Sequence, residues 1–573
     1  MTTTPDAQTI VEPAAPSTPE IVPGTGPVGA DGRDRSKPTP RRWWRRKEGP
    51  NPWRGEILAR LEKPRCFICR EVEINLQRYY FWFLAEQYGN IPTMDRLQQA
   101  HGFCLRHTRH LLERGAPDRT SYVATYVLRF CADWLRSLQA TVTPEWHGSR
   151  ANRQPASRPF GPAVGCPACE QERAAIQLYA QVIVGCLEEM DVVKAFRASD
   201  GLCLPHFLEA ANVAGWETLQ CLTEEQIRHL DEARANLSAI QARGTDGALA
   251  DALREALGRL YGPDLDQSIR SFLVAGRKLG EAPAVDPRGQ SRAQAGVLPT
   301  WSPAFEETCR LLNQPGCNLC RVAARGREEY LVWLEGEIRD CAHLDYRWDQ
   351  ALYLCSQHAW LVADRCAPEV LVTACDRLLA KMAEILRYLL WEIREAIPPS
   401  VGGRVRALPA RWRESGQPES QTHSHPPLSR RVRSTLRTLW LTPERFLGRV
   451  RERILRWDRC PLCRHLGTIE GRAADRLLAV LADAEGWRGF ERSYGLCLRH
   501  APLLLERAGT PGLRRDIAAV LLARVEVDRW EAEEQLRKQS WSVRHEPKGA
   551  EGEAWLRASA RIAGIAMEQP YGF

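Results

Sequence analysis

Apolar residues recur at helical spacing along most of the chain. Val123, Val127, Phe130 and Trp134 follow one another at steps of four, three and four, which is the spacing of one buried helix stripe. A similar run of fours and threes over residues 371–389 predicts a long helix with a narrow apolar seam, suited to pairing with another helix. Strand-like alternation of apolar and polar residues is nearly absent. The pattern therefore predicts an all-α fold.

Segments rich in Pro, Gly, Ser or Arg interrupt this helical pattern and suggest where the domains end. Residues 1–50 contain few large aliphatic side chains and are expected to form a disordered tail. The expected order is the tail (1–50), module 1 (51–142), module 2 with extra helices (164–280), module 3 (300–397), a flexible linker (398–429), module 4 (430–545) and a C-terminal tail (546–573).

Composition narrows the class of protein. The chain has 573 residues and a hydrophobic content of 44%, as expected for a soluble globular protein with several cores. It contains no run of about 18 uncharged apolar residues, so no membrane span is expected. The N-terminus lacks the basic and apolar regions of a secretory signal, which favours a cytoplasmic location.

One cysteine–histidine pattern occurs four times. Each copy has a CxxC pair, then 33 or 34 residues, then a CxxH pair. The copies are Cys66, Cys69, Cys104 and His107; Cys166, Cys169, Cys203 and His206; Cys317, Cys320, Cys355 and His358; and Cys460, Cys463, Cys497 and His500. Cysteines that bind no common ligand would not be expected to recur at one fixed spacing, so a shared metal ion is expected. The repeat uses twelve of the 19 cysteines.

The separations also suggest an internal duplication. Copies one and three have 34 residues between their pairs, and copies two and four have 33. We interpret the chain as a duplicated pair of modules, with one half over residues 50–280 and the other over residues 300–545.

Each copy supplies a complete tetrahedral donor set of three thiolates and one imidazole. A site within each copy would join the helix after CxxC to the helix after CxxH, giving a helical hairpin closed at its base. Helix N-termini beside the thiolates would help to ionise them. The favoured prediction is thus one metal ion inside each of four tandem modules. Pairing between the modules of one half uses the same residues and stays open as an alternative.

The donor set leaves the metal undecided. Structural zinc, about four ions per chain, fits closed four-ligand sites. Iron–sulfur clusters also use cysteine with occasional histidine ligands and are the main alternative. CPAC at Cys166–Cys169 and CPLC at Cys460–Cys463 resemble redox-active CPxC pairs, but no βαβ pattern surrounds them. Haem attachment through CxxCH is excluded because that motif is absent.

Residues outside the repeat are expected to support the fold or the sites. The remaining cysteines mostly fall on apolar helix stripes and are predicted to be buried thiols: Cys131, Cys186, Cys221, Cys309, Cys341, Cys366 and Cys375. Four histidines lie near the motifs and are candidates to donate hydrogen bonds to the ligands, although solvated or capping histidines are more common: His101, His110, His343 and His465. Arg70, Arg321 and Arg464 each follow the second cysteine of a CxxC and are candidates to offset the thiolate charge.

The net charge of +8 is concentrated in two arginine-rich segments, residues 33–47 and 430–459. Such clusters can bind the phosphates of nucleic acid or an anionic membrane surface. A solvated tail and a solvated helix face are the favoured interpretations, because basic amphipathic surfaces are common.

At the second ligand pair the chain resembles an uncharacterised bacterial domain family, whose signature is a CPxC-like pair, an amphipathic helical stretch and GxCxxH. The resemblance rests on GFCLRH, GLCLPH and GLCLRH, at residues 102–107, 201–206 and 495–500. The third copy, LYLCSQH, departs from the signature by lacking the glycine. The resemblance implies metal-binding helical modules and no particular substrate.

No catalytic triad, phosphate-binding glycine loop, HExxH motif or paired-carboxylate site is recognisable, which favours a non-enzymatic role. The leading hypothesis is a zinc-stabilised helical scaffold whose long helices bind a protein partner or another copy. Electron transfer or redox sensing through iron–sulfur clusters is the second hypothesis. Nucleic-acid binding through the arginine-rich segments is the third.

Overall fold

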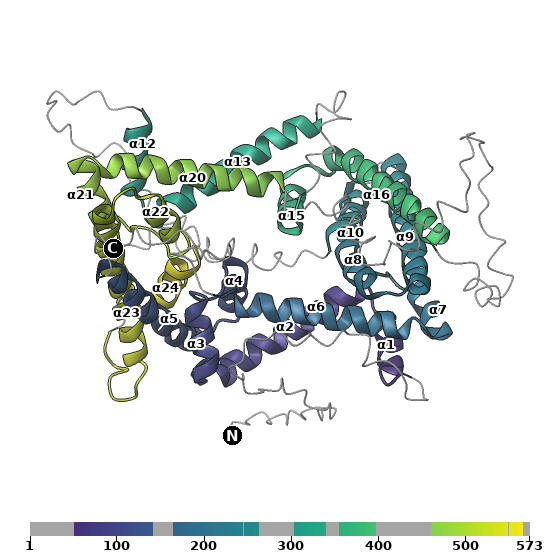
Figure 1. The fold of residues 1–573 in the computed structure, drawn as a ribbon, viewed down its shortest axis with the longest axis horizontal. Helices are drawn as coiled ribbons and strands as arrows, with labels where there is room; N and C mark the ends of the chain where they lie inside the picture. Colours follow the sequence, from purple (N-terminus) through teal and green to yellow (C-terminus); the bar gives the residue numbers. More distant parts are fainter. Residues whose placement is uncertain are drawn as a thin grey trace, which may run out of the picture. The chain divides into compact units, whose positions relative to one another are not determined.

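Every regular element in the described part of the chain is helical. The computed structural model describes residues 51–140, 164–243, 246–262, 303–339, 354–396, 460–547 and 549–564. These residues form nineteen α-helices and two short 3-10 helices without a strand, so the predicted all-α class is confirmed (Figure 1). Within these ranges no helix is both long and apolar enough to cross a membrane. The predicted tail 1–50, the linker 398–429 and the segments 33–47 and 430–459 lie outside the described residues.

The four copies of the motif share one order of helices. A long helix follows CxxC: α2 (Phe67–Ala85), α6 (Pro167–Cys186), α13 (Asn318–Arg339) and α20 (Pro461–Leu481). A short helix begins within CxxH or directly after it: α4 (Leu105–Glu113), α8 (Leu204–Val213), α15 (Ser356–Arg365) and α22 (Ala501–Arg507). A second long helix ends each copy: α5 (Pro117–Ala140), α9 (Trp216–Arg243), α16 (Pro368–Ala396) and α23 (Pro511–Arg537). α1 (Arg54–Leu61) and α12 (Pro303–Leu312) precede the first copy of each half.

Three copies contain a further short helix between the long CxxC helix and the CxxH pair. These helices are α3 (Ile91–Gln99), preceded by η2 (Gln87–Gly89), α7 (Met190–Ala198) and α21 (Ala484–Arg492). The Asn90 side chain accepts a hydrogen bond from the Thr93 amide at 3.1 Å, and Asp483 caps α21 in the same way. An Asn or Asp N-cap is a recognisable helix start, so this signal was present in the sequence.

The long CxxC helices pack in antiparallel pairs, α2 with α6 and α13 with α20. Asn51, before α1, donates its amide to Glu189 after α6 at 3.0 Å. Arg96, after α2, donates to Glu170 at the start of α6 at 3.0 Å. α13 and α20 pass so closely that a Cβ at Gly326 would lie 2.3 Å from Cδ1 of Ile469. Each half of the chain is therefore built around one pair of helices running in opposite directions.

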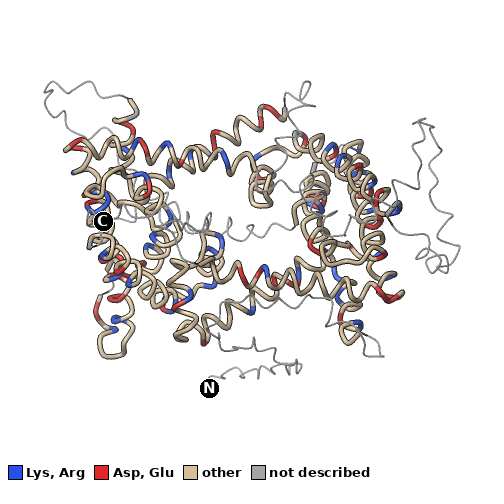
Figure 2. The backbone as a smooth tube through the Cα atoms, viewed as in Figure 1, with Lys and Arg blue, Asp and Glu red and all other residues tan. Residues whose placement is uncertain are grey.

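The two halves contact each other through their terminal long helices. α5 packs against α23, and α9 packs against α16. Ion pairs such as Arg234–Asp376 at 2.8 Å and Arg387–Asp231 at 2.6 Å line the second contact. These pairs are half-exposed and contribute little, so the buried apolar stripes supply most of the stability. Acidic and basic residues are interspersed along the described helices (Figure 2).

The C-terminal segment 546–573, predicted to be a tail, contains packed structure. η7 (Ala550–Glu553) leads into α24 (Ala554–Ala563), which contacts α4, α5 and α23. Ala558 and Ile562 are buried there. The prediction of a tail is thus wrong for residues 549–564. Its counterpart in the first half is α10 (Asp246–Tyr261), which contacts α8, α9, α15 and α16.

Candidate metal centres

The sixteen residues of the repeat come together as four separate groups. In each group the four potential ligand atoms lie within 4.8 Å of one another. Named by their first residue, they are the Cys66 site (Cys66, Cys69, Cys203, His206), the Cys104 site (Cys104, His107, Cys166, Cys169), the Cys317 site (Cys317, Cys320, Cys497, His500) and the Cys355 site (Cys355, His358, Cys460, Cys463). Every group has three thiols and one imidazole, as the motif predicted.

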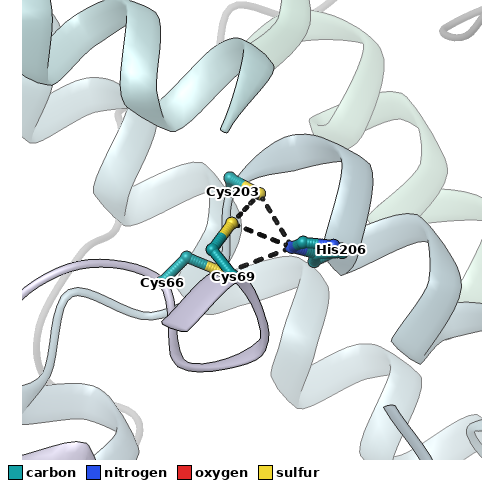
Figure 3. A group of neighbouring side chains, drawn as sticks. All are labelled: Cys66, Cys69, Cys203 and His206. Atoms are coloured by element: carbon teal, nitrogen blue, oxygen red, sulfur yellow. Dashed lines mark hydrogen bonds between the residues drawn. The ribbon is translucent and has the colours of Figure 1, made fainter. Parts of the chain in front are cut away.

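Each group combines CxxC from one copy with CxxH from the other copy of the same half. In the Cys66 site, the pair that begins α2 faces the pair that begins α8 (Figure 3). The prediction of one ion inside each module is therefore wrong, and the alternative of pairing between modules describes the structure. The helical hairpin closed at its base does not form, because the two ends of each copy belong to different sites.

Helix length explains why each site takes its two ligand pairs from different copies. α2 has 19 residues and spans about 28 Å, whereas the nine-residue α3 that follows it is only about 13 Å long. The CxxH of copy one therefore lies far from its own CxxC. Because α6 runs antiparallel to α2, the CxxC at the start of α6 lies beside the far end of α2 and completes the site. The same geometry operates in both directions, giving two sites per half.

Local helix geometry places the two ligands of each pair on one side. Cys66, Cys104, Cys166, Cys203, Cys355 and Cys460 are N-cap residues, and the second ligand of each pair lies in the first turn. A separation of three residues across a helix start directs both side chains to the same ion, beside the positive end of the helix dipole. The glycine of GxCxxH has positive φ in all three copies that carry it, at Gly102, Gly201 and Gly495. Side chains rarely adopt this conformation, which explains why glycine occupies the position.

The distances between ligand atoms are similar in all four sites. The Sγ–Sγ distances between the paired motifs are 3.5 Å for Cys69–Cys203, 3.7 Å for Cys104–Cys169 and Cys320–Cys497, and 3.8 Å for Cys355–Cys463. Each histidine turns Nδ1 towards the sulfur atoms, at 3.0 to 3.6 Å in the Cys66 site and 3.2 to 3.5 Å in the Cys104 site. The same atom lies 3.3 to 3.5 Å from the sulfurs in the Cys317 site and 3.3 to 3.4 Å in the Cys355 site. All described cysteines are free thiols.

The sulfur atoms change the protonation of the histidines. Burial alone would lower the pKa of His107, but hydrogen bonds to Cys104 and Cys166 raise it to about 9. His358 has its pKa raised to about 9 against the effect of burial, by Cys460 and Cys463. A cation bound among the thiolates would replace this proton.

Cysteines outside the groups behave differently. Burial raises the pKa of Cys131 and Cys375 to about 12, and that of Cys186 and Cys221 to about 11. Such thiols stay protonated and unreactive at neutral pH. Cys131, Cys186, Cys366 and Cys375 are buried, as predicted, whereas Cys221 and Cys309 are half-buried. Cys341 lies outside the described residues.

Two glutamates that the sequence analysis missed lie behind the ligand histidines. Glu470 Oε1 is 3.3 Å from Nε2 of His500, and Glu172 Oε2 is 3.7 Å from Nε2 of His107. Burial would raise the pKa of Glu470, but its hydrogen bond to His500 and the charges around it lower the pKa overall. The carboxylate beside Nε2 of His500 favours the tautomer that offers Nδ1 to the ion. Nε2 of His107 lies nearer to Nη2 of Arg106, at 3.1 Å, than to Glu172.

The predicted histidine partners contact other groups. His101 lies against Phe130 and Trp134, and burial lowers its pKa to about 4. His110 Nδ1 lies 3.6 Å from Glu113, and His465 packs on Tyr330 with ring centres 4.9 Å apart. His343 lies outside the described residues.

Two of the predicted arginines hold the chain before CxxC. Arg70 donates to the carbonyls of Lys63 and Pro64 at 3.0 Å, and Arg321 donates to the carbonyl of Pro315. Both contacts fix the turn that presents the first cysteine of the motif. This structural role was not apparent from the sequence.

Comparison with family models, curated proteins and solved structures found no match. The interpretation of the sites therefore depends on their geometry and chemistry.

A buried ion pair beside the Cys317 site gives a first prediction. Arg561 Nε donates to Asp528 at 2.5 Å, and its Nη1 donates to the carbonyls of Tyr494 and Leu496 at 2.7 and 3.1 Å. Arg561→Met is expected to lower the free energy of unfolding by about 3–5 kcal/mol, because Asp528 is left buried and unpaired. Chemical denaturation monitored by circular dichroism measures this change.

Arg529→Met provides the matched control. Arg529 is on the same helix as Asp528 and pairs with Glu526 and Glu533, but its side chain is 26% exposed. Its replacement is expected to cost about 1 kcal/mol or less. An equal decrease in the free energy of unfolding in the two variants would show that the buried Arg561–Asp528 pair contributes no more to stability than the exposed pairs of Arg529.

Proposed function

We propose that the protein is a non-enzymatic zinc protein. Four zinc ions, each bound by three cysteines and one histidine, would hold together two interleaved pairs of helical modules. The spacing of the ligand atoms carries the proposal. With Zn–S bonds of about 2.3 Å and Zn–N bonds of about 2.0–2.1 Å, tetrahedral coordination places sulfur atoms about 3.8 Å apart and sulfur and nitrogen about 3.6 Å apart. The Sγ–Sγ distances of 3.5 to 3.8 Å and the Sγ–Nδ1 distances of 3.0 to 3.6 Å lie near these values.

The same spacing argues against the alternatives. In an iron–sulfur cluster the cysteines bind different iron atoms, and the cluster's own sulfides need room between them. Four ligand atoms within 4.8 Å leave room for one ion only. Thiol–disulfide exchange by CPAC or CPLC is disfavoured because each pair faces the CxxH of another copy, whose histidine and cysteine complete a metal donor set.

Elemental analysis of protein purified without oxygen, together with an absorption spectrum of the same sample, tests the proposal. We expect about four zinc ions per chain and no visible absorption band. Iron accompanied by sulfide, with a broad absorption band at about 400 nm, would indicate iron–sulfur clusters. The protein would then be proposed to function in electron transfer or redox sensing.

The scaffold part of the proposal is supported by exposed large apolar residues at equivalent positions. Phe81 and Trp82 lie twelve and thirteen residues after Cys69, and Val332 and Trp333 lie at the same distance after Cys320. Their side chains are 64%, 52%, 55% and 48% exposed. Paired apolar residues on the outside of α2 and α13 are suited to a protein partner or self-association. Nucleic-acid or anionic-membrane binding through residues 33–47 and 430–459 stays a prediction, tested by whether affinity falls steeply with salt.

A further inference from the structure

Burial divides the four sites into two kinds. In the Cys66 site all three cysteines are buried, and in the Cys317 site all four residues are buried. The Cys104 site has three half-buried cysteines. In the Cys355 site Cys355 is half-buried and Cys463 is exposed. Each half of the chain thus has one closed site and one open site.

Each closed site is covered by the C-terminal end of a helix and the glycine that follows it. α10 ends at Gly262 with φ +81°, and α24 ends at Gly564 with φ +75°. A Cβ at Gly262 would lie 3.6 Å from the sulfurs of Cys69 and Cys203, and one at Gly564 would lie 3.1 Å from the sulfur of Cys497. The left-handed backbone favours glycine at both positions, and at Gly564 the closeness of the Cys497 sulfur adds a steric reason.

An arginine three residues before each glycine holds the covering helix in place. Arg259 donates to the carbonyl and the carboxylate of Asp200, the latter at 3.1 Å. Arg561 donates to the carbonyl of Tyr494 at 2.7 Å. Asp200 and Tyr494 are the residues directly before the glycine of GLC in copies two and four. An Arg-x-x-Gly sequence at the end of an extra helix therefore closes one site in each half.

The covering helix of the first half is also fastened by the second half. Nε1 of Trp360, in α15, donates to the carbonyl of Gly262 at 3.0 Å. Trp360 is buried and lies two residues after His358. The cover over the Cys66 site is therefore held from both sides.

We propose that the Cys104 and Cys355 sites exchange their ions with ligands in solution, whereas the Cys66 and Cys317 sites retain theirs. This inference rests on the proposed zinc function. Substitution at four-coordinate zinc requires an entering donor to reach the ion, which can expand to five ligands. At the open sites an incoming thiolate or imidazole has access beside Cys463 or the Cys104 group. Zinc–sulfur bonds break, bonds to the acceptor form, and the displaced thiolates take up protons from water, without electron transfer.

The chain would then accept and deliver up to two zinc ions while the other two keep it folded. The acceptor or donor is identified by its chemistry: a small molecule or protein with soft thiolate or borderline imidazole ligands.

Zinc release from the full-length, fully loaded chain to an excess of pyridylazoresorcinol, a coloured chelator, tests the inference. Two ions are expected to leave at least about tenfold faster than the other two, which corresponds to about 1.4 kcal/mol in the barrier. Alkylation with iodoacetamide after the fast phase should modify Cys104, Cys166, Cys169, Cys355, Cys460 and Cys463, as read by mass spectrometry. Cysteines of the Cys66 and Cys317 sites should stay protected. This measurement needs no variant.

Variants show which site releases its ion in the fast phase and which in the slow phase. Cys463→Ser should reduce the fast phase from two ions to one. Gly564→Ala should displace the cover and move one ion from the slow to the fast phase. Gly115→Ala is the matched control, since Gly115 also has positive φ, at +61°, but has nothing within 4 Å of an added Cβ. It should leave both phases unchanged.

A single rate for all four ions, or alkylation first at the Cys66 or Cys317 site, would overturn the inference and leave the proposed zinc function intact. A chain that contains no zinc before the chelator is added would overturn both.

Discussion

Replacing Cys69 and Cys203 together by serine is expected to remove one metal ion from the chain, the same number as either single replacement. The two cysteines lie 100 or more residues apart in sequence, but their sulfur atoms are 3.5 Å apart in the Cys66 site. Once the first replacement has broken the site, the second has no further ion to release. Elemental analysis after dialysis against a weak chelator gives the count, with three ions expected in all three variants.

The control is the double variant Cys69→Ser/Cys104→Ser, which alters two cysteines of a single copy of the motif. These residues belong to different sites, so this variant is expected to lose two ions. The control variant should also be less stable than Cys69→Ser/Cys203→Ser, because it loses one more ion. Apparent binding energies of structural zinc reach about 10–16 kcal/mol in zinc-finger peptides. Loss of two ions from Cys69→Ser/Cys203→Ser, and of one from the control, would restore the model of one ion per module.

Complete removal of metal is expected to unfold most of the helical structure. The ligand pairs fix the starts of α2, α6, α8 and α4 in the first half, and the corresponding helix starts in the second. Without an ion, three thiols and an imidazole per site are left without their shared ligand, and the helix starts lose their common anchor. Circular dichroism during chelation under reducing conditions should show a large loss of helix signal.

Addition of zinc should restore the signal, whereas calcium, which prefers oxygen ligands, should not. If the metal-free chain kept its full helix signal and its melting temperature, the ions would not hold the fold together.

From the sequence alone, the helical class and the sixteen residues that meet in groups could be predicted. Helical periodicity is a local property, visible in stripes such as Val123 to Trp134, and a fixed CxxC to CxxH spacing is visible in one dimension. Copies one and two share two sites, as do copies three and four, whereas the contacts α5–α23 and α9–α16 join the two halves.

Only the tertiary structure decided which pairs share a site. That depends on how far α2 carries the chain, on the return path through α3, and on the antiparallel approach of α6, none of which appears in the spacing of Cys66 and Cys104. The covers at Gly262 and Gly564 were equally hidden, because a glycine after an ordinary amphipathic helix gains its meaning from the sulfur atoms that packing places beside it. The sequence determined the local helices and the donor atoms. Contacts between residues distant in sequence decided their partners, because the paired cysteines, 65 residues apart at Cys104–Cys169 and 177 at Cys320–Cys497, meet only after the helices have packed.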